Sequence, residues 1–214
     1  MPILVVGTPH PENERRNKLL VAAAYAGVVV DVDNTFNPSA ASADQDYLLN
    51  SHPIGRNPVL RTDEGPIFES NSILRHIARL DLTGKLYGTT PYMHSQVDMW
   101  LDFTLSEMDP IFQPFLTGLF SGVPPANIPE LKGKATEVFH GLNAWLETRT
   151  FLVGERLTVA DIALAFALTW LYRYAAFGKE FHGTYTNVKR LYNTVMKNPS
   201  TVNVLARVGA SFYE

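Results

Sequence analysis

The chain has 214 residues, which suits one large domain or two small ones, and its 46% hydrophobic content argues against disorder. Its net charge of −3, from 18 basic and 21 acidic residues, is too small to indicate nucleic acid or anionic lipid as the main partner. The absence of cysteine excludes disulfides, thiolate metal sites and a cysteine nucleophile. Because the N-terminus has no basic region before an apolar core, no signal peptide is indicated and a cytoplasmic protein is expected.

The first part of the chain alternates between strand and helix patterns. The short apolar run Ile3–Val6 predicts a buried strand. Residues 12–26 carry leucine and alanine at helical spacing, and Gly27 suits a helix C-terminus. The β-branched run 28–32 predicts a second buried strand. Strand, helix and strand of these lengths make a right-handed parallel unit.

A loop, a hairpin and a helix complete this part. Residues 37–50 look irregular, with one short helix starting near Asp44. Two short β-type runs, 58–62 and 66–68, flank an Asp-Glu-Gly turn and predict a hairpin. Residues 69–80 place four apolar side chains on one helical face, at Ile73, Leu74, Ile77 and Leu80. The first 80 residues therefore form a β-α-β unit, a loop and a β-β-α unit.

The remainder has only helical patterns. Residues 81–91 are rich in glycine and poor in apolar residues, which is typical of a linker between domains. The expected organisation is an α/β domain at 1–80, this linker, and an all-helical domain at 92–214. Helices are predicted at 92–119 with a bend at Pro110 and Pro114, and at 130–148, 158–175, 184–197 and 199–208.

The helix at 158–175 has the clearest start signal in the chain. Thr158 and Asp161 stand three residues apart before an apolar run, which is the spacing of a capping box. From Ile162 to Tyr172 no residue carries a charge at neutral pH, so the helix lacks a polar face and is expected to be buried on all sides. The run is far shorter than the roughly 20 apolar residues that span a bilayer.

This organisation resembles that of glutathione transferases, and two motifs support the resemblance. The segment Ser51-His-Pro-Ile-Gly-Arg-Asn-Pro-Val-Leu60 resembles the one before the family's third strand, and Phe68-Glu-Ser-Asn-Ser-Ile73 resembles its helix start. Within the family, the chain resembles the elongation factor 1-gamma branch. Its resemblance is carried by Pro11-Glu-Asn13, by Thr148-Arg-Thr-Phe-Leu-Val-Gly-Glu-Arg-Leu-Thr-Val-Ala-Asp-Ile162 and by Thr169-Trp-Leu-Tyr172.

The resemblance implies a thioredoxin-like domain followed by a transferase-type helical domain, and a role in translation elongation. The chain would scaffold the nucleotide-exchange subunits of the elongation factor 1 complex and retain a site for glutathione or a glutathione conjugate. The alternative is a stand-alone S-transferase that conjugates glutathione or trypanothione to small electrophiles. A homodimer is expected by analogy, without direct contact to nucleic acid or membrane.

The resemblance places the charged γ-glutamyl end of the thiol at Glu69 and Ser70. Ser70 would lie at a helix N-terminus, where free amides and the helix dipole favour a carboxylate. Glu69 can accept from the α-amino group in a charge-assisted hydrogen bond. The alternative is that both residues only cap their helix.

The turn before the third predicted strand supplies the remaining binding residues. The resemblance implies a cis peptide bond between Asn57 and Pro58, which exposes the Asn57 backbone to the cysteinyl residue of the ligand. It also implies that Arg56 holds the glycyl carboxylate. The alternatives are an ordinary proline at a strand start and a solvated surface arginine.

Activation of the thiol needs a donor near the sulfur, since a free thiol has a pKa of about 8.5. The family places tyrosine, serine or cysteine after the first strand, whereas here the loop offers Thr8 and His10. Arg15 would add positive potential at the start of the first helix. This departure from the family pattern argues against efficient catalysis but not against thiol binding. No metal site is expected, because His76 and His140 lack partner ligands at metal spacing.

Overall fold

The computed structural model describes residues 3–6, 13–33 and 37–214. Its contacts divide the chain into two compact units. The first comprises residues 1–87 together with 199–211, and the second comprises 88–198 together with 212–214. The first unit holds the sheet, and every element of the second is helical within the described residues, which confirms the predicted α/β plus all-α class.

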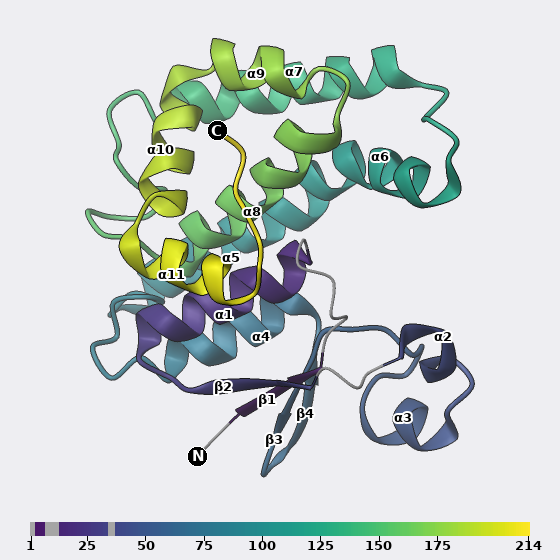
Figure 1. Cartoon of the computed structure of the whole chain (residues 1–214). Coiled ribbons are helices and arrows are strands. Elements are labelled where there is room, and N and C mark those ends of the chain that lie inside the picture. The colour runs from purple at the N-terminus through teal and green to yellow at the C-terminus, as the bar shows by residue number, and fades with distance from the viewer. Residues whose placement is uncertain (1–2, 7–12, 34–36) are drawn as a thin grey trace. The chain divides into compact units, whose positions relative to one another are not determined.

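The first unit is built on a four-stranded sheet with the order β2-β1-β3-β4 (Figure 1). The strands are β1 (Ile3–Val6), β2 (Val30–Asp33), β3 (Val59–Thr62) and β4 (Gly65–Phe68). Strand β1 runs parallel to β2 and antiparallel to β3, and β3 and β4 form the predicted hairpin. The parallel β1-α1-β2 unit is also as predicted.

The prediction for the second strand, β2, was wrong in its start and in its burial. Strand β2 was predicted as a buried strand at 28–32, but it begins at Val30, lies at the edge of the sheet, and none of its residues is fully buried. The physical reason is twofold: the alternation Val-Asp-Val-Asp suits a strand with one solvated face, and the edge position leaves β2 with a partner strand on one side only.

Three longer helices belong to the first unit. They are α1 (Glu14–Ala26), α4 (Ser70–Arg79) and α11 (Pro199–Arg207), with α1 packed against both α4 and α11. The predicted apolar face of α4 is buried at Ile73, Leu74 and Ile77, while Leu80 follows the helix and is partly exposed. Gly27 ends α1 in the left-handed conformation, as predicted.

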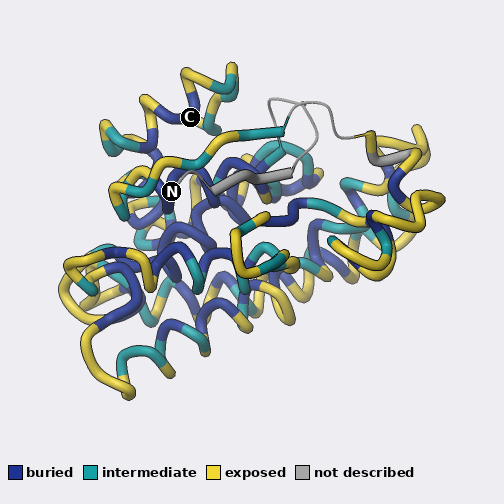
Figure 2. The backbone as a smooth tube through the Cα atoms, turned by 90° about the horizontal axis from the view of Figure 1, so that it is seen from below, coloured by how far each residue is buried: buried dark blue, intermediate teal, exposed yellow. Residues whose placement is uncertain are grey.

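The connection between β2 and β3 holds more structure than the sequence suggested. It contains two short helices, α2 (Pro38–Ala41) and α3 (Gln45–Asn50), where one was expected. The side chain of Asp44 caps α3 by accepting a hydrogen bond from the amide of Tyr47. Tyr47 then packs against Val59 of β3, which fixes this connection on the sheet. Figure 2 shows the mixture of buried and exposed residues along it.

The second unit is a bundle whose elements follow one another closely. They are α5 (Pro91–Phe103), the π-helical turn η1 (Thr104–Met108), α6 (Asp109–Ser121), α7 (Ile128–Trp145), α8 (Val159–Tyr174), α9 (Gly178–Thr184) and α10 (Thr186–Met196). The expected irregularity near Pro110 takes the form of the wider turn η1, because proline has no amide to continue the α-helical bonding pattern. Among the described helices, none has the combination of length and apolar character needed to cross a membrane.

Helix α8 is the core of the second unit. It packs against α5, α6, α9 and α10, and its side chains from Val159 to Thr169 are all buried (Figure 1). The amide and hydroxyl of Thr158 donate to Oδ2 of Asp161 at 2.8 and 3.0 Å, which forms a capping box. The amide of Leu152 donates to Oδ1 of the same carboxylate at 2.8 Å, so Asp161 also fixes the preceding loop.

Candidate functional site

The hairpin of the first unit brings two of the predicted binding segments to one end of the sheet. Val59 of β3 pairs with Phe68 of β4. Because the pairing is antiparallel, Pro58 before β3 and Glu69 after β4 leave the sheet side by side. The peptide bond between Asn57 and Pro58 is cis, as the family resemblance implied.

Glu69 has an unusual backbone and an exposed side chain that does not cap the helix after it. With φ 67° and ψ 115°, it is the one non-glycine residue with positive φ in the described part of the chain. Such a conformation costs of order 1–3 kcal/mol and is found mainly where function requires it. Glu69 precedes α4, yet its carboxylate makes no capping hydrogen bond and is exposed. The alternative that Glu69 only caps its helix therefore does not describe this structure.

Ser70 is the first residue of α4 and is half-buried. The carbonyl of Glu69 already accepts from the amide of Ile73 at 3.0 Å, which closes the first helical turn. The amides within that turn have no intrahelical acceptor, and together with the helix dipole they favour an anion. The hydroxyl of Ser70 lies beside them, so this helix start can bind a carboxylate.

The turn that carries Arg56 and Asn57 is held in place from α3. The hydroxyl of Tyr47 donates to the carbonyl of Arg56 at 2.8 Å. Arg56 is exposed, Asn57 is half-buried and Pro58 is buried. The guanidinium of Arg56 is thus free to reach outward while its backbone is anchored.

Gly55 makes this turn sterically possible, which gives a stability prediction. Its φ is +69°, and a Cβ there would lie 2.7 Å from the backbone of Ser42. We expect Gly55→Ala to lower the free energy of unfolding by about 2–4 kcal/mol, from left-handed strain and backbone displacement. Gly27→Ala is the matched control, because Gly27 has the same φ of +69° with open space around it, and it should cost only about 1 kcal/mol. Equal losses in urea denaturation would contradict the steric argument.

His52 belongs to the site and was not among the predicted site residues. Its side chain is buried, its Nδ1 accepts from the amide of Ile54 at 3.2 Å, and its ring packs against Phe68 at 4.8 Å. Burial lowers the pKa of His52; the charge of Glu69 opposes this shift and that of Arg56 adds to it. His52 is therefore neutral at pH 7 and lies within electrostatic reach of both charged residues. In sequence it stands in an irregular segment, where no periodicity signals burial.

Lys18 of helix α1 is a second residue near the site that was not among the predicted site residues. Nζ of Lys18 donates to Oδ1 of Asn71 at 2.7 Å, which links α1 to the first turn of α4 beside Ser70. Arg15 is exposed in the first turn of α1, one helical turn before Lys18. Thr8 and His10 lie outside the described residues, so their assignment as sulfur donors remains a prediction.

Two domain models of one known family match the sequence of this chain. The model of the glutathione S-transferase N-terminal domain matches residues 9–79, and the model of the C-terminal domain matches residues 107–199. The chain belongs to the glutathione S-transferase family. The thioredoxin-like first part and the transferase-type helical part are thereby confirmed.

Curated relatives connect this family member with a translation factor. Elongation factor 1-gamma of Trypanosoma cruzi is 52% identical over 206 residues, which cover 95% of this chain and 49% of the relative. Elongation factor 1-gamma of Danio rerio is 34% identical, with 93% of this chain and 45% of the relative covered. A probable elongation factor 1-gamma 1 of Arabidopsis thaliana is 32% identical, with 92% and 47% covered. The chain thus spans about half the length of the curated relatives it matches.

Solved structures agree on the fold. Poplar glutathione transferase F1 has a TM-score of 0.85 at 20% identity and covers 98% of this chain and 99% of its own. Glutathione S-transferase I from mais, in complex with an atrazine glutathione conjugate, has a TM-score of 0.83 at 20% identity, with 98% and 99% covered. At these identities the likeness shows the transferase fold alone.

Proposed function

We propose that this chain is the transferase-like part of an elongation factor 1-gamma and that it scaffolds nucleotide-exchange subunits in the cytoplasm. The proposal is supported by the 52% identity with the Trypanosoma cruzi factor, which extends over both units of the fold. A homodimer is part of the proposal, by analogy with transferases of this fold.

We also propose that the site at Glu69 and Ser70 binds glutathione or a glutathione conjugate. The observation that carries this proposal is the strained backbone of Glu69 directly before a helix N-terminus, with a carboxylate that does not cap the helix. A residue held in a costly conformation at the N-terminus of a helix is better explained by a ligand than by folding alone.

In this proposal, each group of the site binds one part of the tripeptide. The γ-glutamyl carboxylate meets the first amides of α4 and the hydroxyl of Ser70, while its α-amino group donates to Glu69. The exposed backbone of Asn57 pairs with the cysteinyl residue, and Arg56 binds the glycyl carboxylate. Neutral His52 packs beneath Phe68 and keeps the segment before Glu69 in place.

The scaffolding role predicts a stable complex with an exchange subunit from the same organism. When the two purified proteins are mixed at micromolar concentration, we expect them to coelute in size-exclusion chromatography. Glu69→Gln serves as a control for independence, since a change in the thiol site should leave this complex intact. Separate elution of the two wild-type proteins would contradict the scaffold proposal and leave the thiol proposal unaffected.

A further inference from the structure

A groove in the first unit, away from the thiol site, is lined by three elements. It has a volume of about 340 Å³ and lies between the last turns of α1, the strand β2 and the helix α11. Leu20 and Ala23 line it from α1, and Val204 and Val208 line it from α11. Its walls are therefore mainly aliphatic.

The remaining wall is the free edge of the sheet. Five consecutive residues, 28–32, line the groove. Residues 30–32 of this run belong to β2, and because side chains alternate between the two faces of a strand, three consecutive strand residues at the wall bring the backbone itself to it. In the described part of the chain β2 pairs only with β1, and its outer backbone groups are thus available for another strand.

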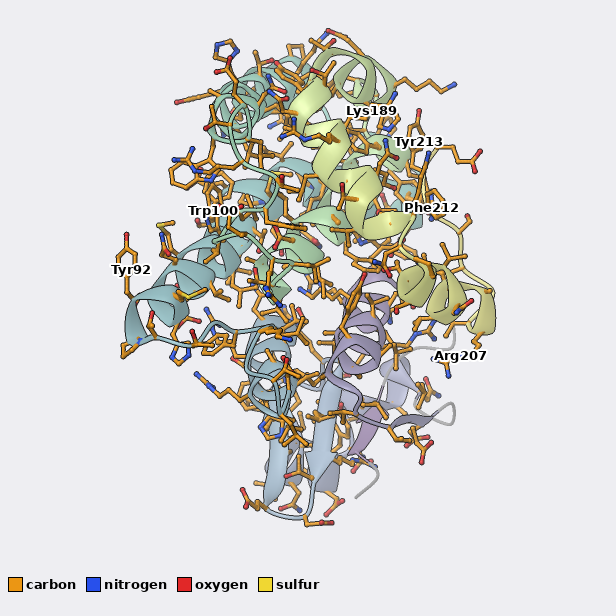
Figure 3. The ribbon with its side chains drawn as sticks, turned by 90° about the vertical axis from the view of Figure 1, so that its left-hand side faces the viewer. Tyr92, Trp100, Lys189, Arg207, Phe212 and Tyr213 are labelled. Carbon is orange, nitrogen blue, oxygen red and sulfur yellow. The ribbon has the colours of Figure 1, made fainter. Side chains whose placement is uncertain are left out.

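The charges at the groove differ between the two faces of β2. Asp33 forms an ion pair with Arg61 at 3.7 Å, and by alternation Asp31 lies on that same face. Val30 and Val32 lie on the opposite face. Arg207 lines the groove from α11 (Figure 3), and neither it nor Asp31 forms an ion pair with a residue that the structure describes.

We propose that this groove binds an extended segment of a partner protein in which apolar and basic residues alternate, added to the sheet as a strand next to β2. Its apolar side chains occupy the aliphatic groove beside Val30 and Val32. Its basic side chains lie beside Asp31 on the other face. A shift by one residue would turn the basic side chains toward Arg207 and the apolar ones toward Asp31, so the charges fix the register as well as the composition.

The same charges disfavour a second copy of this chain as the occupant. Two β2 edges side by side would bring Asp31 and Asp33 of one copy next to those of the other, and like charges across neighbouring strands are destabilising. Strand addition to a sheet edge is a general mode of peptide recognition, with backbone bonds giving affinity and alternate side chains giving specificity. The partner class is therefore a basic, apolar extended segment.

The test uses the whole chain, labelled with ¹⁵N, and an acetylated and amidated hexapeptide of alternating valine and lysine. We expect saturable amide shifts centred on residues 28–32. Asp31→Lys should raise the Kd about tenfold, because an attractive cross-strand pair becomes a repulsive one. Asp63→Lys is the matched control, since Asp63 is an exposed acid in the turn between β3 and β4, and it should leave the Kd unchanged.

Two further peptides separate backbone pairing from charge. Methylation of alternate peptide amides should abolish binding, and glutamate in place of lysine should weaken it for the wild type and strengthen it for Asp31→Lys. Equal effects of Asp31→Lys and Asp63→Lys would overturn the proposal, because they would indicate unspecific attraction to an acidic surface. Shifts at 28–32 that grow with protein concentration in the absence of peptide would also overturn it, in favour of a second copy.

Discussion

Replacing Asp161 with alanine is expected to lower the free energy of unfolding by about 3–5 kcal/mol, the largest stability effect predicted here. The carboxylate is fully buried and accepts from the amides of Leu152 and Thr158 and from the Thr158 hydroxyl. Without it, these donors remain buried with no acceptor and α8 loses its N-terminal cap. Urea denaturation of wild type and variant measures the loss.

Asp161→Asn removes the titrating group and keeps one acceptor oxygen, while its Nδ2 takes the place of the other acceptor. Burial raises the pKa of Asp161 to about 6, against 3.8 for the ordinary value, and the hydrogen bonds from Leu152 and Thr158 only partly oppose this shift. Between pH 3.8 and about 6, the carboxyl of Asp161 holds a proton in the folded chain and has lost it in the unfolded chain. The contribution of Asp161 to the free energy of unfolding therefore falls as the pH rises through this window. The asparagine variant should lack this fall.

An alanine variant within about 1 kcal/mol of wild type would contradict the role of Asp161.

Replacing Glu69 with glutamine is expected to raise the Kd for glutathione by about 10- to 100-fold, because a hydrogen bond to a charged acceptor contributes about 1.5–3 kcal/mol. Ser70→Ala leaves the first amides of α4 to hold the γ-glutamyl carboxylate and should raise the Kd by less, about fivefold. Isothermal titration calorimetry measures both.

Glu64→Gln is the matched control for Glu69→Gln. Glu64 is an exposed acid in the turn of the same hairpin, at the opposite end from Glu69. Its replacement should leave glutathione affinity unchanged. If both variants bind as tightly as wild type, the α-amino group is not held by Glu69 and the assignment is wrong.

Features with strong local causes were predictable from the sequence. The three-residue spacing of Thr158 and Asp161 and the apolar stretch after it define a core helix. Gly27 marks a helix end, and the Asp-Glu-Gly turn with β-type runs on both sides marks the β3–β4 hairpin.

Features that depend on distant contacts were not predictable. Nothing in the valine-rich run before Asp33 shows that β2 lies at the sheet edge, because that position is decided by which strands pair with β1. Helix α11 packs on α1 of the first unit although it follows the helices of the second. The domain limits at 80 and 92 remain predictions.

In the candidate site, too, some features could be predicted from the sequence and others could not. The residue types at Arg56, Asn57, Glu69 and Ser70 could be assigned from the family motif. The positive φ of Glu69 could not, since no glycine or asparagine marks the position. His52 lies before β3 and packs against Phe68 at the end of β4, a contact between distant parts of the sequence. The roles of Thr8 and His10 remain predictions because those residues lie outside the described part.

A crystal structure of the chain soaked with glutathione tests the thiol site most directly. We expect the γ-glutamyl carboxylate at the first amides of α4 and the hydroxyl of Ser70, with the α-amino group on Glu69. A helix start without ligand at a saturating concentration, or a tripeptide bound elsewhere, would contradict it.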